Sequence, residues 1–316
     1  MGEILEWGQL AEQDVQKIRQ RYVKERVQVS REDREMPPPG LSLVSPTSGI
    51  ASEWFRSLRM KQRFVVRGAA AAKETRKAVL IGAWAAAQWG MWFVLPNDPA
   101  VEFALPSGHQ PSKSMLPPGV RFRSLKLREG DVMELDGVRV TNPLRTYLDL
   151  CRMRNRTNAW LAAGWLLERG ISAQEIAEYA ESFDGPMHPN RRRLAVSLPH
   201  RAREVGSFPN LLAYALLEHS PVSVRTHCEL DEMGHAVLLA GNDLVIAVDE
   251  DPLCRELESE GDGDGLARNR RKRERWIAAR GFRKLYFTAE EIEADPDGFV
   301  SEVLGATRLR NRRLTY

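Results

Sequence analysis

Short apolar runs separated by polar residues follow one another between residues 92 and 140, and this pattern is typical of β-strands. The predicted strands are Trp92–Leu95, Val101–Leu105, Val120–Leu125, Val132–Leu135 and Val138–Val140. The last two enclose Asp136-Gly137, a dipeptide that favours a tight hairpin because both residues tolerate positive φ. A small sheet is therefore expected in the middle of the chain.

The longest apolar run, Ala78–Leu95, has eighteen residues and no charge. That length is close to the minimum for a membrane-spanning helix. The run contains Gln88 and many small residues, however, and no second run of this kind occurs in the chain. We therefore interpret it as a buried helix that leads into the strand at Trp92, and we expect no membrane association.

The first fifty residues divide into two parts. Residues 10–28 have a loose apolar stripe at helical spacing. Residues 31–49 contain three consecutive prolines together with several Ser and Gly residues, which predicts a linker or an extended arm. Residues 1–50 are therefore expected to form an N-terminal helix and a Pro-rich arm.

Capping residues mark the starts of two helices beyond the predicted sheet. Thr141 or Asn142 precedes Pro143, which suits the first position of a helix. Ser172 and Glu175 have the spacing of a capping box. Further helical patterns cover residues 157–204 and 208–219.

The last third of the chain predicts the order α-β-β-β-α-β-α. Its strands are Val222–Leu230, His235–Ala240, Leu244–Asp249 and Phe282–Thr288. An acidic loop at 251–265 precedes a very basic helix, Ala267–Arg280. The patterns together predict a mixed α+β or α/β protein with two folded domains and four segments, at residues 1–50, 51–156, 157–206 and 207–316.

Composition and charge narrow the function classes. The chain has 316 residues and a formal net charge of +3, and Arg supplies most of its 46 basic residues. This bias has two explanations, a GC-rich genome or the suitability of Arg for phosphate and base edges. Three cysteines in no metal-binding or paired pattern and an N-terminus without signal-peptide features favour a soluble protein of the reducing cytoplasm.

Residues 78–152 resemble the core of abortive-infection (AbiEi-type) antitoxins. The matching segments are AVLIGAWAAAQWGMW, VEFALP and GVRVTNPLRTYLDLCR, of which the last is similar to a Gly-Val-x-Val-Thr-x-Pro-x-Arg-Thr-x-x-Asp motif. Members of that family usually begin with a winged helix-turn-helix, and the sequence ahead of Ala78 shows no clear one. The resemblance implies a DNA-binding regulatory or antitoxin-like protein of bacterial or phage defence, with a toxin or another defence component as a protein partner.

The segment from about Ser207 to Val303 resembles very-short-patch-repair endonucleases of the PD-(D/E)xK superfamily by layout. That family has a Glu where this chain has Asn210, and an Asp ligand where the layout places Leu238. Asp249 and Asp251 match the acids at the end of the following strand, but no His follows them in the loop. The resemblance therefore implies a nuclease-like domain that lacks much of its metal-binding set.

Asp249 and Asp251 are the predicted catalytic and metal-binding residues. They lie two apart on a strand end, so their side chains should point to the same face. Mg²⁺ requires several oxygen ligands to activate water and to neutralise the phosphate. Two carboxylates are half of such a site, which Asp243 or Asp231 would have to complete. The alternative is a solvated strand end that leads into the acidic loop.

Basic residues in three places are candidates for contact with nucleic acid. Two of these places supply the predicted DNA-binding residues. The basic helix supplies Arg268, Arg270, Arg271, Lys272, Arg273 and Arg275, and the helical segment at 157–204 supplies Arg191, Arg192 and Arg193. Residues 51–67 interleave basic and aromatic residues, which suits a phosphate backbone or an ordinary solvated helix face.

Three functions remain open from these residues. The first is a non-catalytic DNA-binding protein, and the second is a Mg²⁺-dependent endonuclease at Asp249 and Asp251. The third is an interaction protein that meets its partner through the acidic loop or the N-terminal arm.

Overall fold

The structure is a computed structural model that describes residues 10–30, 32–75, 77–96, 98, 100–112, 116, 119–153, 155–231, 234–249, 275 and 278–311. The chain divides into two compact units. The N-terminal unit is Gln9–Leu198, and the C-terminal unit contains Pro199–Tyr316. The division falls within one helix, α9 (Pro189–Val205), at its internal Pro199.

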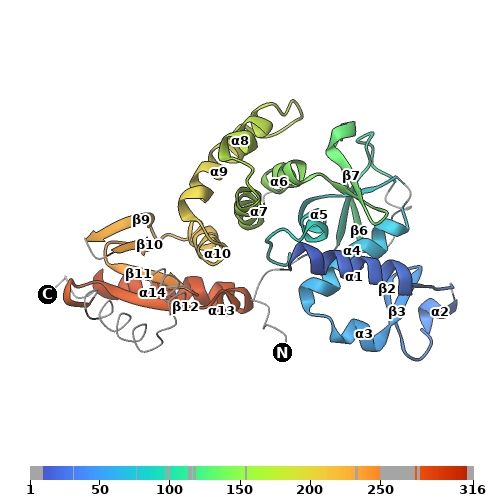
Figure 1. Cartoon of the computed structure of the whole chain (residues 1–316), viewed down its shortest axis with the longest axis horizontal. Helices are drawn as coiled ribbons and strands as arrows, with labels where there is room; N and C mark the ends of the chain where they lie inside the picture. Colours follow the sequence, from blue (N-terminus) through green and yellow to red (C-terminus); the bar gives the residue numbers. More distant parts are fainter. Residues whose placement is uncertain are drawn as a thin grey trace. The chain divides into compact units, whose positions relative to one another are not determined.

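The N-terminal unit begins with helices around a three-stranded antiparallel sheet (Figure 1). The strands lie in the order β1-β3-β2, and they are β1 (Val27–Gln28), β2 (Leu41–Ser45) and β3 (Ser48–Ala51). The helices are α1 (Glu12–Glu25), α2 (Glu32–Glu35), α3 (Ser52–Ser57) and α4 (Met60–Lys73). Residues 31–49 were predicted to be a linker, and the structure corrects this prediction, because they contain β2 and begin β3.

Side chains from outside the hairpin explain why this segment folds. Glu74, at the end of α4, accepts hydrogen bonds from the Thr47 amide and the Thr47 hydroxyl, both at 2.6 Å. The Tyr22 hydroxyl of α1 hydrogen-bonds Ser48 at 3.2 Å, and Ile50 is fully buried. The β2–β3 turn is therefore held by distant partners that its local sequence does not reveal.

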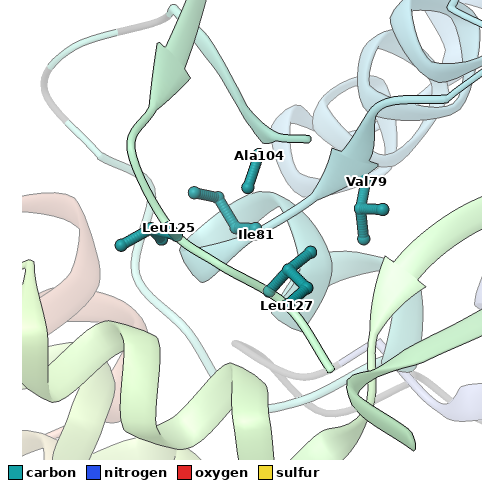
Figure 2. Packing of buried hydrophobic residues seen from close by; sticks show 5 residues of the cluster. All are labelled: Val79, Ile81, Ala104, Leu125 and Leu127. Carbon is teal, nitrogen blue, oxygen red and sulfur yellow. The ribbon is translucent and has the colours of Figure 1, made fainter. Parts of the chain in front are cut away.

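Residues 78–141 form the larger sheet of the N-terminal unit, in the order β6-β5-β4-β8-β7. Its strands are β4 (Val79–Leu80), β5 (Val101–Ala104), β6 (Val120–Arg123), β7 (Val132–Leu135) and β8 (Val138–Thr141). The predicted hairpin at Asp136-Gly137 is confirmed, and both residues have positive φ, 50° and 75°. Figure 2 shows a core cluster from this sheet and the segment after β6, formed by Val79, Ile81, Ala104, Leu125 and Leu127.

The apolar run forms the predicted buried helix, α5 (Gly82–Trp89). Every residue of this helix is buried in the N-terminal unit. No helix among the described residues has the length and apolar character needed to cross a membrane. The predicted strand at Trp92–Leu95 is wrong, since Gly90 ends α5 in the left-handed conformation and no ladder follows. The buried Asn158 side chain instead pairs with both the amide and the carbonyl of Val94, at 2.7 and 2.9 Å.

Four helices complete the N-terminal unit in the described part of the chain: α6 (Pro143–Arg152), α7 (Arg156–Glu168), α8 (Ala173–Glu181) and the first part of α9. The predicted caps are confirmed. The Asn142 side chain accepts from the Arg145 amide, and Ser172 and Glu175 form a reciprocal capping box. The Tyr147 hydroxyl donates to the Ala195 carbonyl at 2.7 Å, which ties α9 to α6.

The C-terminal unit places a four-stranded mixed sheet among helices. After α10 (Phe208–Leu217), the strands lie in the order β12-β11-β10-β9. They are β9 (Val224–Asp231), β10 (Gly234–Ala240), β11 (Leu244–Val248) and β12 (Arg283–Phe287). Strands β9, β10 and β11 are antiparallel neighbours, whereas β12 is parallel to β11. Helices α13 (Ala289–Ala294) and α14 (Pro296–Asn311) follow.

The mixed α and β character predicted from the sequence is confirmed by both units. The predicted strands of the last third all form, with ends that differ by a few residues. The acidic loop and most of the basic helix, at 251–274, lie outside the described residues.

Candidate nucleic-acid interface

Helices α3 and α4 place two arginines against one aromatic ring, and two more arginines lie nearby in the sequence. Phe55 is half-buried on α3, and Arg63 and Arg67 of α4 lie with their guanidinium carbons 5.4 and 5.7 Å from the centre of its ring. Arg56 and Arg59 are exposed beside them. We call these five residues, Phe55, Arg56, Arg59, Arg63 and Arg67, the Phe55 surface.

Backbone carbonyls at the end of α3 hold this surface in place. The Arg63 guanidinium donates to the carbonyls of Phe55 and Arg56, at 3.1 and 2.8 Å. These carbonyls belong to the last turn of a short helix, where the helix dipole favours a cation. The Phe55 carbonyl also accepts from the Leu58 amide at 3.4 Å. Arg63 therefore joins α3 to α4 and fixes the Phe55 ring between two guanidinium groups.

The helical repeat sets the spacing of these arginines. Arg59, Arg63 and Arg67 are four residues apart, so they lie along one side of the helix start and rise by about 6 Å per step. The opposite side of α4 packs in the core through Phe64, Val65 and a run of alanines. The buried face of α4 therefore keeps Arg59, Arg63 and Arg67 on the side of the helix that faces away from the core.

Three arginines of the Phe55 surface lack a neighbouring acid in the part of the chain that the structure describes. Among the described residues, Arg56, Arg63 and Arg67 have no carboxylate within salt-bridge distance, and Glu53 is the one acidic residue within α3 and α4. Elsewhere in the same unit, exposed arginines pair with acids, as in Arg121–Asp98 and Arg128–Asp184. Arg56 and Arg63 donate only to backbone carbonyls, which leave their charge uncompensated. Guanidinium groups without a carboxylate, beside an aromatic ring, are suited to phosphate contacts and to base stacking.

Asp249, a predicted metal ligand, ends β11 in a left-handed conformation with φ of 47°. Its carboxylate oxygen accepts a hydrogen bond from the Ala289 amide at 3.0 Å, and its own amide donates to the Phe287 carbonyl at 3.0 Å. Both contacts join the end of β11 to the start of α13. The residue has a structural role in this arrangement, and Asp251 lies outside the described residues.

The other positions of the predicted metal site do not bring acids to Asp249. Leu238, at the place of the expected Asp, is fully buried on β10 opposite Ile246. Asp243 is paired with Arg283 at 3.0 Å. The Asn210 side chain donates to the Ser207 hydroxyl. In the described ranges no three His, Cys, Asp or Glu side chains gather as metal ligands would.

The predicted DNA-binding residues fall into three groups. Arg268, Arg270, Arg271, Lys272 and Arg273 lie outside the described residues, and Arg275 is an exposed helical residue. Arg191 and Arg192 are engaged by their own chain. Arg191 donates to the Arg152 carbonyl, and Arg192 donates to the Phe183 and Gly185 carbonyls at 2.5 and 3.3 Å. Arg193 is exposed.

The Arg191–Arg193 run thus has a folding role that the charge pattern does not reveal. Two of its guanidinium groups bind carbonyls of the chain, which leaves one side chain directed to solvent. The position of the run in the first turn of α9 explains this role. There the two guanidinium groups reach carbonyls at the end of α6 and in the segment after α8. The last carbonyls of a helix have no amide donor from within that helix.

A buried charge network joins α6 to Asp131 and to Tyr179 of α8. Arg145 and Asp149 of α6 form an ion pair at 3.0 Å, and Arg145 also binds Asp131 at 2.5 Å. Tyr179 donates to the same Asp131 at 2.9 Å. Burial raises the pKa of Asp149, while Arg145 and Arg152 act in the opposite direction. Sequence spacing could reveal the helical pair but not Asp131, which comes from the turn before β7.

Cys151, the cysteine of this motif, is not placed for nucleophilic chemistry. It is almost fully buried, and that burial raises the pKa of its thiol to about 12. The reactive form of a cysteine is the thiolate. Cys151 is therefore a packing residue of α6.

Comparisons with models of protein families, with curated proteins and with solved structures each found no match for this chain.

Proposed function

We propose that this chain is a DNA-binding protein of regulatory or antitoxin type, which binds the phosphate backbone through the Phe55 surface and does not cleave it. The observation that carries the proposal is the Phe55 surface itself. Three of its arginines have no carboxylate partner among the described residues, and one aromatic ring supports two of them. Leaving such charges unpaired serves binding of an anion better than it serves folding.

The C-terminal unit supports the second half of the proposal. Its order of α10, three antiparallel strands and a parallel β12 is the layout expected of a PD-(D/E)xK nuclease. The residues at the ligand positions differ from that pattern. Leu238 is buried and apolar, Asn210 replaces the Glu, and Asp249 binds the Ala289 amide. We therefore propose that this unit keeps a nuclease-like framework without the nuclease reaction.

The binding test uses two triple variants with the same change in charge. Arg56→Gln/Arg59→Gln/Arg67→Gln should weaken binding of a labelled DNA duplex and should reduce the slope of log affinity against log salt by about 2–3, because each phosphate contact contributes roughly one. Fluorescence anisotropy in EDTA at several salt concentrations measures both quantities. Arg63 is left unchanged, since it holds α3 to α4.

The matched control is Arg121→Gln/Arg123→Gln/Arg128→Gln. These arginines are about as exposed but pair with Asp98, Glu102 and Asp184 in the same unit. The control should change affinity and salt slope much less. An equal loss in both variants would show that only net charge matters, and it would remove the Phe55 surface from the proposal.

The cleavage test compares the wild type with Asp249→Asn/Asp251→Asn on supercoiled plasmid, with Mg²⁺ or Mn²⁺ and with EDTA. Asn at position 249 keeps an oxygen for the Ala289 amide, so the variant should fold. We expect no metal-dependent nicking above the buffer background from either protein. Nicking by the wild type that the variant loses would replace the proposal with a Mg²⁺-dependent endonuclease.

A further inference from the structure

A polar pocket lies between the small sheet of the N-terminal unit and the end of α4. It encloses about 320 Å³, which exceeds the volume of one water molecule several times. Three segments far apart in the sequence, at 26–28, 47–48 and 73–74, form its walls and supply its charges. Its lining residues are Arg26, Val27, Gln28, Thr47, Ser48, Lys73 and Glu74.

Two cations share this pocket. Arg26 caps the end of α1, and Lys73 is the last residue of α4. Burial lowers the pKa of the Lys73 ammonium, and the charge of Arg26 lowers it further. Neither side chain has a carboxylate within salt-bridge distance among the described residues. The charges of Arg26 and Lys73 repel each other, and an anion bound between them would relieve that repulsion.

The acids nearest to the pocket have other partners. One carboxylate oxygen of Glu74 accepts from the amide and hydroxyl of Thr47. Asp136 binds Arg19 at 2.8 Å and Gln20 at 3.3 Å. Glu134 and Asp136 favour the charged form of Lys73, but by less than burial and Arg26 oppose it. Of the charged residues that line the pocket, two are cations and one, Glu74, is a carboxylate, so the lining carries one net positive charge.

The turn of the β7–β8 hairpin fixes the position of Lys73. A Cβ added at Gly137 would lie 2.1 Å from the Lys73 ammonium nitrogen, so the side chain passes directly over this glycine. Gly137 also has φ of 75°, which the hairpin turn requires. The lysine is thus held by the fold rather than left to move in solvent.

We propose that this pocket binds a phosphoryl anion, whose oxygens lie between the Arg26 guanidinium and the Lys73 ammonium. A phosphoryl group accepts several charge-assisted hydrogen bonds, and a guanidinium with an ammonium is a recurrent pair for it. The source is either free phosphate or the 5′-phosphate of a nucleotide. The site shares no residue with the Phe55 surface, whose nearest member, Arg67, lies about 9 Å along α4 from Lys73.

The test is calorimetric titration of the purified full chain with inorganic phosphate, with a nucleoside 5′-monophosphate and with the matching nucleoside. Arg26→Gln and Lys73→Gln should each weaken phosphate binding by about tenfold or more. Lys77→Gln is the matched control, since it removes one exposed lysine close in sequence. Lys73→Arg retains the charge and should retain most of the binding.

The arms of the titration identify the source. Tighter binding of the monophosphate than of phosphate assigns a nucleotide, and equal binding assigns free phosphate. Equal phosphate affinity in the wild type, both pocket variants and the control would overturn the proposal, as would no binding of either phosphorylated probe. The triple variant of the Phe55 surface should bind phosphate like the wild type, so failure of either idea leaves the other standing.

Discussion

Replacing Arg145 with alanine should lower the free energy of unfolding of the N-terminal unit by about 3–5 kcal/mol. Arg145 is 1% exposed and binds Asp131 and Asp149, which are also buried. The variant removes the cation partner of Asp131 and leaves Asp149 with the more distant Arg152, at 3.6 Å. One oxygen of Asp149 already lacks a hydrogen-bond partner among the described residues. The loss of the Arg145 hydrogen bond would therefore add to the unsatisfied polar groups of this network.

Urea unfolding followed by tryptophan fluorescence measures this loss, because six of the eight tryptophans lie in the N-terminal unit. Arg128→Ala is the control: its pair with Asp184 is exposed to solvent and should contribute little to stability. The loss in the Arg145 variant should be smaller near pH 5 than near pH 8, because unpaired buried carboxyl groups have raised pKa values and take up protons as the pH falls. A loss below about 1 kcal/mol at neutral pH would contradict the network's role.

Placing an acid at position 238, where a nuclease of this layout has its ligand, should unfold the C-terminal sheet rather than create a metal site. Leu238 is fully buried on β10 between Thr226 of β9 and Ile246 of β11. The paired residues Thr226 and Ile246 offer no cation to a carboxylate there, so Leu238→Asp should destabilise the C-terminal unit by about 3–5 kcal/mol. Hydrogen exchange of peptides from β10 and β11 should show lost protection.

The control for this variant is Leu238→Met, which keeps the volume and the apolar character and should cost less than about 1.5 kcal/mol. Retained protection in Leu238→Asp on addition of Mg²⁺, together with new DNA cleavage, would show that the framework still accepts a catalytic metal. That outcome would contradict the proposal that the framework has lost its reaction.

The parts of the fold that the sequence predicted correctly are those with local causes. Asp136-Gly137 makes a hairpin because both residues tolerate positive φ. Asn142 before Pro143, and Ser172 with Glu175, cap helices by contacts within one turn. The order of strands in the last third follows from apolar runs of strand length.

The errors have distant causes. The Pro-rich segment folds as a hairpin because Tyr22 and Glu74 hold its turn. The apolar run at Trp92 fails to become a strand because the Asn158 side chain takes the amide and carbonyl of Val94. No pattern within either segment contains this information, since the partners lie elsewhere in the chain.

For the candidate site, too, the sequence identifies the types of residue present, whereas the contacts of those residues depend on the fold. Basic and aromatic residues at 51–67 could be recognised from the sequence, but their grouping around Phe55 depends on how α3 meets α4. Arg191 and Arg192 appeared equally suited to DNA, yet they bind carbonyls of their own unit. Asp249 matched a metal ligand by position, while its contact with Ala289 is visible only in the structure.

The parallel pairing of β12 with β11 bears on how the C-terminal unit folds during synthesis. Leu244 pairs with Arg283, so the sheet closes across a long stretch of intervening chain. Such distant pairing forms slowly, because the loop entropy is lost before the contacts are gained. Until β12 has left the ribosome, β11 presents an unpaired edge with buried-type side chains. Nascent chains that stop short of residue 283 should therefore be the ones that depend most on chaperones.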